Sequence, residues 1–157
     1  MIDWYACDGL GFPFDDVYFR TIDVAAPATL VYRWLCQLRA RRVPRSARPE
    51  FDRLQIGQRY LRDFRIVGFE PGVHVTVVMR GSAPARLLGD VAATFALRQD
   101  YAGTRLVVKE LVRYPSGILG WLPRLVKPAL DLLTLRLALG ALAKRAERDY
   151  EEFVEHA

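Results

Sequence analysis

Histidine, cysteine and the common catalytic motifs are scarce in this sequence of 157 residues. It has two histidines, far apart, and two cysteines, Cys7 and Cys36, without CxxC spacing. A metal site built on histidine therefore has little support, and we expect neither a metal nor a cofactor. The motifs GxxxxGKS/T, GxGxxG, HExxH and GxSxG are missing as well. Phosphate loops, dinucleotide binding, zinc proteolysis and α/β-hydrolase chemistry are accordingly not indicated.

Neither a leader nor a membrane span is expected from the sequence. Its first eight residues contain no basic segment followed by an apolar run, so a signal peptide is not expected. The stretch 125–142 is apolar, but charges interrupt every window of about 20 residues that a membrane span needs. These charges are on Arg124, Lys127, Asp131 and Arg136. Together with the two unpaired thiols, these absences favour a cytoplasmic protein without a transmembrane segment.

The overall composition is that of a globular protein. Hydrophobic residues make up 52% and charged residues 26% of the chain, which argues against disorder. A chain of this length can bury enough surface to fold as one domain without disulfides or metals. Residues 1–16 combine glycine, proline and several aromatic side chains, and we interpret them as an N-terminal arm. Residues 17–157 are interpreted as a single domain.

Positive charge is concentrated in one segment, Arg39 to Arg53. The net charge of the chain is +5, and this segment, with six arginines against Glu50 and Asp52, contributes +4. A basic patch that contacts bases usually carries interleaved aromatic rings, and here only Phe51 is nearby. We therefore expect no nucleic-acid partner and favour a solvated loop. The alternatives are a contact to anionic lipid or an acidic ligand at a cavity entrance, or to nucleic acid.

The front of the domain is predicted to be a strand that runs into a helix. Val17 to Val24 is rich in β-branched and aromatic residues, which is typical of a strand. Pro27 suits the first turn of a helix, where its missing N–H costs nothing. We expect this helix to end before Pro44. Its apolar residues have helical spacing and form one stripe: Leu30, Val31, Trp34, Leu35 and Leu38.

The middle of the sequence predicts an antiparallel meander. Strands resume near Ile56, and Phe69-Glu-Pro71-Gly72 is a strong turn signal. Val73 to Met79 then alternates, which places the valines on a buried face and His74 and Thr76 on a solvent face. The elements that follow are a loop over 82–89, a strand over 93–99, a turn over 100–103 and a strand over 104–113.

The sequence closes with a long helix, expected to start near Lys127 because Pro128 suits a first turn. Its first half is apolar nearly all round, and its second half is amphipathic and charged. A helix apolar on most sides is normally buried or in lipid, and burial inside a curved sheet accounts for it better than a membrane span. The whole pattern describes an α+β fold in which a curved antiparallel sheet grips a helix, an arrangement that normally leaves a cavity.

Six short stretches, in order, carry a family resemblance: Ile22 to Pro27 with Val31 and Trp34, Ile56-Gly57, Phe69 to Gly72, Phe95 to Leu97, Gly103 to Leu106, and Leu142 to Glu147. Over about 20–150 the chain resembles the START-like or SRPBCC superfamily, which includes polyketide cyclases and lipid-transfer proteins. The resemblance implies the helix-grip fold. It specifies no function, because one fold hosts many chemistries. The segment before Ile56 is shorter than in many such proteins and rich in arginine, which implies a more open or more basic cavity entrance.

Two polar residues are expected on the inner face of such a sheet. Arg20 shares the side of Ile22 on the first strand, and Glu110 shares the side of Leu106 and Val108 on the last. These strands are antiparallel neighbours in a helix-grip sheet, so Arg20 and Glu110 could meet. One interpretation is a structural ion pair, and another is a pair that orients a ligand or exchanges protons with it. A register shifted by one residue would instead place both outside.

Residues from all around the implied cavity are candidates for the binding site. The predicted ligand-binding residues are Arg20, Trp34, Tyr60, Met79, Phe95, Glu110, Leu133 and Leu137. We predict that they hold a small hydrophobic molecule, lipid-like or polyketide-like. One alternative is an enzyme resembling polyketide cyclases or aromatases, with Arg20, Glu110 and Tyr60 as catalytic candidates. The other is a protein-interaction module with a filled interior, forming a homodimer through the first half of the last helix.

Overall fold

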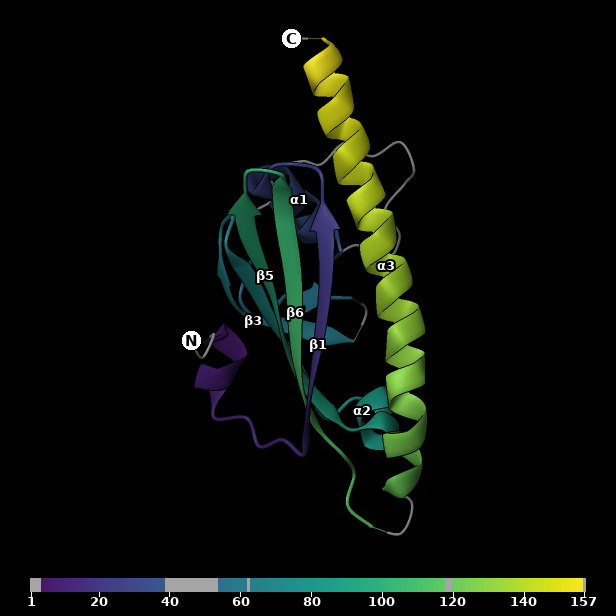
Figure 1. Cartoon of the computed structure of the whole chain (residues 1–157). Coiled ribbons are helices and arrows are strands. Elements are labelled where there is room, and N and C mark those ends of the chain that lie inside the picture. Colours follow the sequence, from purple (N-terminus) through teal and green to yellow (C-terminus); the bar gives the residue numbers. More distant parts are fainter. Residues whose placement is uncertain (1–3, 39–53, 62, 118–119, 157) are drawn as a thin grey trace.

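The computed structural model describes residues 4–38, 54–61, 63–117 and 120–156, with side chains outside 127–134. The elements follow one another along the chain as shown in Figure 1. They are the 3-10 helix η1 (Ala6–Leu10), β1 (Asp16–Val24), α1 (Ala28–Gln37), β2 (Arg59–Tyr60), β3 (Phe64–Glu70), β4 (His74–Met79), α2 (Ala83–Leu88), β5 (Asp90–Asp100), β6 (Gly103–Arg113) and α3 (Trp121–Glu155).

The strands form one antiparallel sheet in the order β1-β6-β5-β4-β3-β2. Consecutive strands from β2 to β6 are neighbours, which is the predicted meander, and β1 joins the free side of β6. The long helix α3 lies along one face of this sheet (Figure 1). The α+β helix-grip architecture predicted from the sequence is therefore confirmed.

Two glycines make the tight connections of the meander possible. Gly72, at φ +76°, closes the turn between β3 and β4 as the sequence predicts. Gly103 opens β6 at φ +145°, and a Cβ there would lie 2.3 Å from the carbonyl oxygen of Val24. A side chain at residue 103 would therefore push β6 away from the end of β1.

The inner face of the sheet is covered by α1 and by the second half of α3. Phe95, Leu106 and Val108 are at most 2% exposed, and they belong to the same cluster as Leu139 and Leu142 of α3. We call this cluster the main inner cluster. Its further buried members include Val24, Val31, Trp34, Leu35, Tyr60, Ile66, Val75, Val77, Ala93, Ala143 and Ala146.

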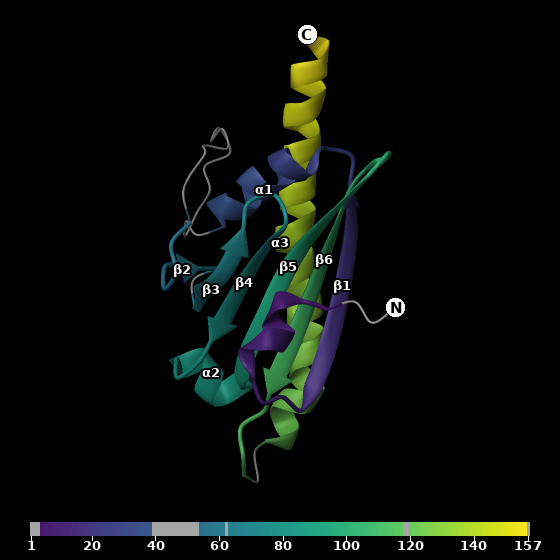
Figure 2. The ribbon, with the colours of Figure 1, turned by 90° about the vertical axis from the view of Figure 1, so that its left-hand side faces the viewer.

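The outer face is covered by the N-terminal arm, and this overturns the expectation that Thr76 faces solvent. Figure 2 shows η1 on the side of the sheet opposite α3. Tyr5, Cys7 and Phe12 form an outer cluster with Ala92, Val107 and Leu111. Thr76 is only 1% exposed, and its hydroxyl lies 3.0 Å from that of Thr94. Alternation correctly separates the two faces, but it does not reveal that a distant segment covers the second one.

Three further expectations need correction. Ile56 lies in a turn and is 65% exposed, and the strand near it is only Arg59–Tyr60. Residues 82–89 are not simply loop, since α2 forms there with the hydroxyl of Ser82 accepting from the backbone N–H of Ala85. The last helix begins at Trp121, six residues before Lys127, because a proline at position 123 is tolerated in the first turn.

The arginine-rich segment Arg39 to Arg53 lies outside the described residues, so the interpretations of it stay predictions. Among the helices that the structure describes, none has the length and apolar character to cross a membrane.

The buried threonines of the outer face allow a direct test of how the arm is held. The hydroxyl of Thr94 accepts the backbone N–H of Cys7 at 2.9 Å. Thr94→Val should lower the free energy of unfolding by about 1–3 kcal/mol, because a buried donor loses its acceptor. Thr94→Ser keeps the hydroxyl and is the matched control. Urea denaturation followed by circular dichroism measures both, and a loss below about 0.5 kcal/mol for the valine variant would contradict this role.

Candidate functional site

A group of polar side chains lies on the inner face of the sheet, on the neighbouring strands β1 and β6. In their register Tyr18 pairs with Glu110 and Arg20 with Val108. Ile22 and Leu106, the next pair along, belong to or pack against the main inner cluster. Because side chains alternate between faces, Tyr18, Arg20 and Glu110 point to the same side as that cluster. The register predicted from the sequence is thus the one observed.

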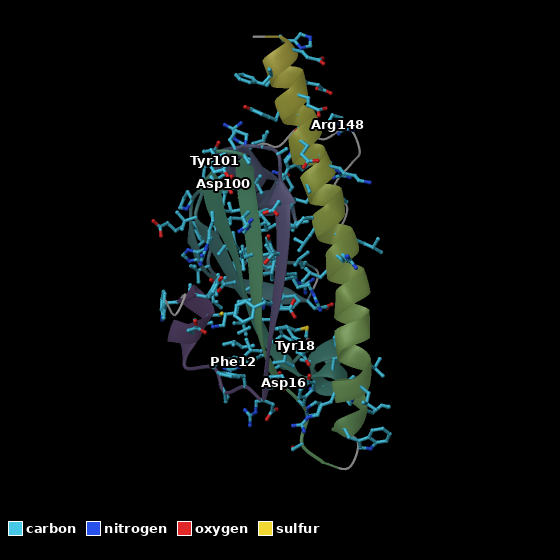
Figure 3. The ribbon with its side chains drawn as sticks, in the orientation of Figure 1. Phe12, Asp16, Tyr18, Asp100, Tyr101 and Arg148 are labelled. Carbon is cyan, nitrogen blue, oxygen red and sulfur yellow. The ribbon has the colours of Figure 1, made fainter. Side chains whose placement is uncertain are left out.

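This polar group lies between two apolar clusters, and Phe64 packs against both of them. On one side is the main inner cluster, and on the other a second inner cluster at the α2 end of the sheet. In Figure 3, Asp16 and Tyr18 mark the α2 end, and Asp100 and Tyr101 mark the opposite end. The second inner cluster consists of Met79, Ala85, Val91, Val112 and Tyr114, with Tyr18 and Phe64 packed against it.

Tyr18 and Tyr114 meet at the border of the polar group. Their hydroxyl oxygens are 2.6 Å apart, and the Tyr18 hydroxyl also reaches a carboxylate oxygen of Asp16 at 3.5 Å. Burial and then the hydrogen bond with Tyr18 raise the pKa of Tyr114 above its ordinary value. Sequence analysis singled out neither tyrosine. The alternation that places Arg20 on the inner face also places Tyr18 there, whereas Tyr114 follows the end of β6 and no strand pattern covers it.

Arg20 and Glu110 share the inner face of the sheet. Their Cα positions are diagonal in the register, two residues apart along the strand, and a meeting of the two side chains stays a prediction. Glu110 is 7% exposed. The Nε atom of Arg20 is buried and finds no hydrogen-bond partner among the residues that the structure describes. A buried donor without an acceptor costs stability. The Nε–H of Arg20 could therefore donate a hydrogen bond to an oxygen atom of a ligand.

Tyr60 and Phe95, two other predicted site residues, pack against each other in the main inner cluster. Their rings meet edge to face at 5.9 Å. Tyr60 is fully buried, its hydroxyl donates to the carbonyl oxygen of Leu35 at 2.9 Å, and burial raises its pKa well above the ordinary value. This hydroxyl is committed to the backbone of α1, so the structure gives no support for Tyr60 as a proton donor to a ligand.

Trp34 connects the two helices of the inner face. It is 2% exposed, its indole Nε1 donates to a carboxylate oxygen of Asp149 at 2.9 Å, and the guanidinium of Arg145 lies 5.4 Å from its ring centre. These contacts hold α1 against α3. Trp34 therefore positions the helix that closes the site.

The remaining predicted site residues differ in their position. Met79 is 6% exposed in the second inner cluster, next to the polar group. Leu137 is 66% exposed and lies on the side of α3 turned away from Leu139 and Leu142, so it does not line the interior. The side chain of Leu133 lies outside those described.

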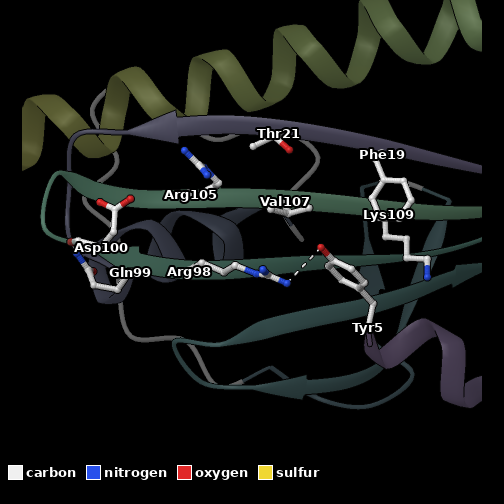
Figure 4. Close-up of a pocket in the computed structure, with 9 residues that line it drawn as sticks. All are labelled: Tyr5, Phe19, Thr21, Arg98, Gln99, Asp100, Arg105, Val107 and Lys109. Atoms are coloured by element: carbon white, nitrogen blue, oxygen red, sulfur yellow. Dashed lines mark hydrogen bonds between the residues drawn. The ribbon is translucent and has the colours of Figure 1, made fainter. Parts of the chain in front are cut away.

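The described structure has hollows on its outside. One of about 550 Å³ on the outer face combines Tyr5 and Phe19 with Arg98, Arg105 and Lys109, and Figure 4 shows Arg98 reaching the Tyr5 hydroxyl. The cations Lys109 and Arg105 are paired with Asp8 at 2.6 Å and with Asp23 at 2.8 Å. In the described parts of the chain no group of three or more His, Cys, Asp or Glu residues could hold a metal ion.

The inner arrangement has a clear chemical capacity. A guanidinium, a carboxyl and two phenol groups lie on a wall that is otherwise apolar. Such a wall can enclose a hydrophobic molecule and orient its few polar atoms, which is the usual composition of small-molecule sites.

Comparison with known proteins supports the fold. No family model matches the sequence, and no curated protein matches it. Zhui, an aromatase/cyclase from Streptomyces sp. R1128, has a TM-score of 0.59 and 18% identity over 85% of this chain and 94% of its own. Protein CV1439 from Chromobacterium violaceum has a TM-score of 0.55 and 19% identity over 85% and 99%. The di-domain aromatase/cyclase BexL from the BE-7585A biosynthetic pathway has a TM-score of 0.56 and 17% identity, over 84% of this chain and 50% of its own.

At these identities the similarity establishes the fold. The molecule has the helix-grip fold, as the resemblance to START-like proteins implied, and structures with this fold include aromatase/cyclases.

The buried tyrosines predict how stability depends on pH. The pKa values of Tyr60 and Tyr114 are raised mainly by burial, so above about pH 10 the folded chain holds protons that the unfolded chain loses. This contribution to stability is complete below about pH 10 and falls as the pH rises further. Urea midpoints between about pH 8 and 11 should decline at the alkaline end, and less steeply for Tyr60→Phe. Ionisation of these tyrosines near pH 10 in a folded chain of unchanged stability would contradict the assignment.

Proposed function

We propose that this protein binds a small hydrophobic molecule, lipid-like or polyketide-like, between the inner face of the sheet and α3. The observation that carries the proposal is the polar group of Tyr18, Arg20 and Glu110 in the interval between two apolar clusters. A core that served only packing would carry apolar side chains at these three positions. The apolar clusters would hold the body of the ligand, and Arg20 would donate to one of its oxygen atoms.

A cavity and a filled core respond in opposite ways to an enlarged side chain. Ala93 is the cross-strand partner of Glu110 on the inner face, whereas Ala92, its chain neighbour, is buried in the outer cluster under the arm. Ala93→Leu should leave the free energy of unfolding within about 0.5 kcal/mol and abolish binding of a neutral hydrophobic fluorescent probe. Ala92→Leu should cost about 1–3 kcal/mol, because overpacking a tight core forces neighbours to move.

The same pair of variants separates the alternatives. If Ala93→Leu is as destabilising as Ala92→Leu and the wild type binds no probe, the interior is filled and the interaction module of the sequence analysis is favoured. If Ala93→Leu is stable and still binds the probe as the wild type does, the ligand lies elsewhere.

A second candidate function is a cyclase-like or aromatase-like reaction in the same site. The observation that favours it is the number of inward polar groups, since Tyr18 and Tyr114 join Arg20 and Glu110. In an intramolecular aldol reaction Glu110 would take a proton from the carbon that attacks, and Arg20 would stabilise the enolate and carbonyl oxygens. As the new carbon–carbon bond forms, the C=O π bond opens to an alkoxide, and Glu110 would return its proton to that oxygen. Orientation of a flexible chain by the apolar walls would supply much of the rate.

This second function is tested with a short poly-β-ketone thioester and chromatography of its cyclised products. Glu110→Gln should lower the rate by about 10²-fold or more while probe binding is retained, because the shape of the site is kept and the base is lost. Product formation at the uncatalysed rate by the wild type, with the probe bound normally, would leave binding as the function and exclude this reaction for that substrate.

A further inference from the structure

The first turns of α3 carry large apolar side chains that are exposed. Trp121, Leu122, Leu125 and Val126 are 58, 47, 67 and 41% exposed. Leu87 of α2, a helix that contacts α3, is 73% exposed. Figures 1 and 2 place α2 and the beginning of α3 at the same end of the molecule, opposite the C-terminus. We call these five residues the apolar tip.

The apolar tip continues the helix face that covers the sheet. Trp121 and Leu125 precede Leu139 and Ala143 by about five helical turns, so the two pairs lie on one side of α3. Leu139 and Ala143 are 3 and 5% exposed, because they pack in the main inner cluster. The beginning of α3 extends past the start of β1 (Figure 1). Trp121 and Leu125 thus lie on the same face of α3 as the buried residues Leu139 and Ala143, but they are exposed to solvent.

Arginines surround the apolar tip. A hollow of about 500 Å³ contains Arg113, Trp121 and Arg124, and an adjoining one of about 310 Å³ contains Arg113 and Arg86. The acidic residues in these hollows are Asp15 and Asp90, and Asp15 lies 3.9 Å from Arg124. The two hollows therefore contain three arginines and two aspartates, which gives them a net positive charge.

An apolar helix end with a tryptophan and a rim of arginines fits a lipid surface. Tryptophan is enriched at the level of lipid headgroups, and arginines attract anionic headgroups. A second copy of the chain fits less well, because a two-fold contact would bring the same arginines of both copies together. We propose that the apolar tip docks on the surface of membranes that contain anionic lipids.

The apolar tip lies next to the α2 end of the inner site. The link between docking and ligand uptake rests on the proposed function. The guanidinium of Arg124 lies 5.1 Å from the ring centre of Tyr114. The hydroxyl of the same tyrosine contacts Tyr18 at the border of the inner polar group. Docking would therefore bring the α2 end of the inner site to the membrane, where hydrophobic molecules are dissolved.

Vesicle flotation of the full chain tests the proposal. Vesicles of phosphatidylcholine mixed with phosphatidylglycerol should bind the protein about tenfold or more tightly than phosphatidylcholine alone, and salt should weaken binding. Trp121→Ser combined with Leu125→Ser should lower binding by about tenfold or more. The matched control is Phe153→Ser with Val154→Ser at the other end of α3. These two apolar side chains are similarly exposed, Phe153 by 71% and Val154 by 56%. It should bind as the wild type does, and circular dichroism confirms that both variants fold.

Tryptophan fluorescence gives a second readout. Trp34 is buried and Trp4 is 69% exposed, so in a Trp4→Phe background a shift to shorter wavelength on adding anionic vesicles reports on Trp121. The proposal is overturned if the wild type does not float with vesicles, or if the control variant loses as much binding as the tip variant. It is also overturned if the wild type is a dimer that the tip variant makes monomeric and no vesicles are bound.

Failure of this inference is distinguishable from failure of the proposed function. Ala93→Leu changes the inner face and should float with vesicles as the wild type does. A protein that floats but takes up no hydrophobic probe retains the docking surface and contradicts the ligand proposal. A protein that takes up the probe in solution but does not float contradicts docking alone.

Discussion

The structure depends on one constraint, that the apolar inner face of an open antiparallel sheet must be covered by a helix from the end of the chain. Phe95, Leu106 and Val108 present that face, and Leu139 and Leu142 of α3 cover it. The hydrophobic effect scales with the apolar area removed from water, so this contact holds sheet and helix together. Trp34 fixes the position of α3 through Asp149 and the cation of Arg145. In our proposal the ligand lies between the inner face of the sheet and α3, so the packing of α3 on the sheet also encloses the ligand.

The inner face of the sheet changes from apolar to polar along its length, so its two ends differ in chemistry. Near the C-terminal half of α3 the wall is a continuous apolar core, and towards α2 it becomes the polar group of Tyr18, Arg20 and Glu110. Beyond that group α3 extends past the start of β1 and leaves the apolar tip exposed (Figure 1). One helix face thus serves packing at one end and, in our proposal, contact with lipid at the other. The inner site lies between the two.

The sequence was sufficient for the sheet because strand periodicity is a local property. Alternation around Ile22 and around Leu106 correctly placed Arg20 and Glu110 on the inner face. It could not show whether two such side chains touch, since that depends on a diagonal offset across strands. It also could not show that η1 covers Thr76, which is a contact between distant segments. The sequence analysis predicted Leu137 as a ligand-binding residue, whereas the position of the helix over the sheet leaves it exposed. Tyr18 and Tyr114 became visible as a pair only in three dimensions.

The central claim is that the space between the sheet and α3 holds a small hydrophobic molecule. Native mass spectrometry of the purified chain, before and after mixing with neutral lipids and aromatic polyketides, tests it most directly. The account predicts one bound molecule per chain, extractable with organic solvent and absent from Ala93→Leu. A wild-type chain that keeps its bare mass in every mixture would contradict the claim.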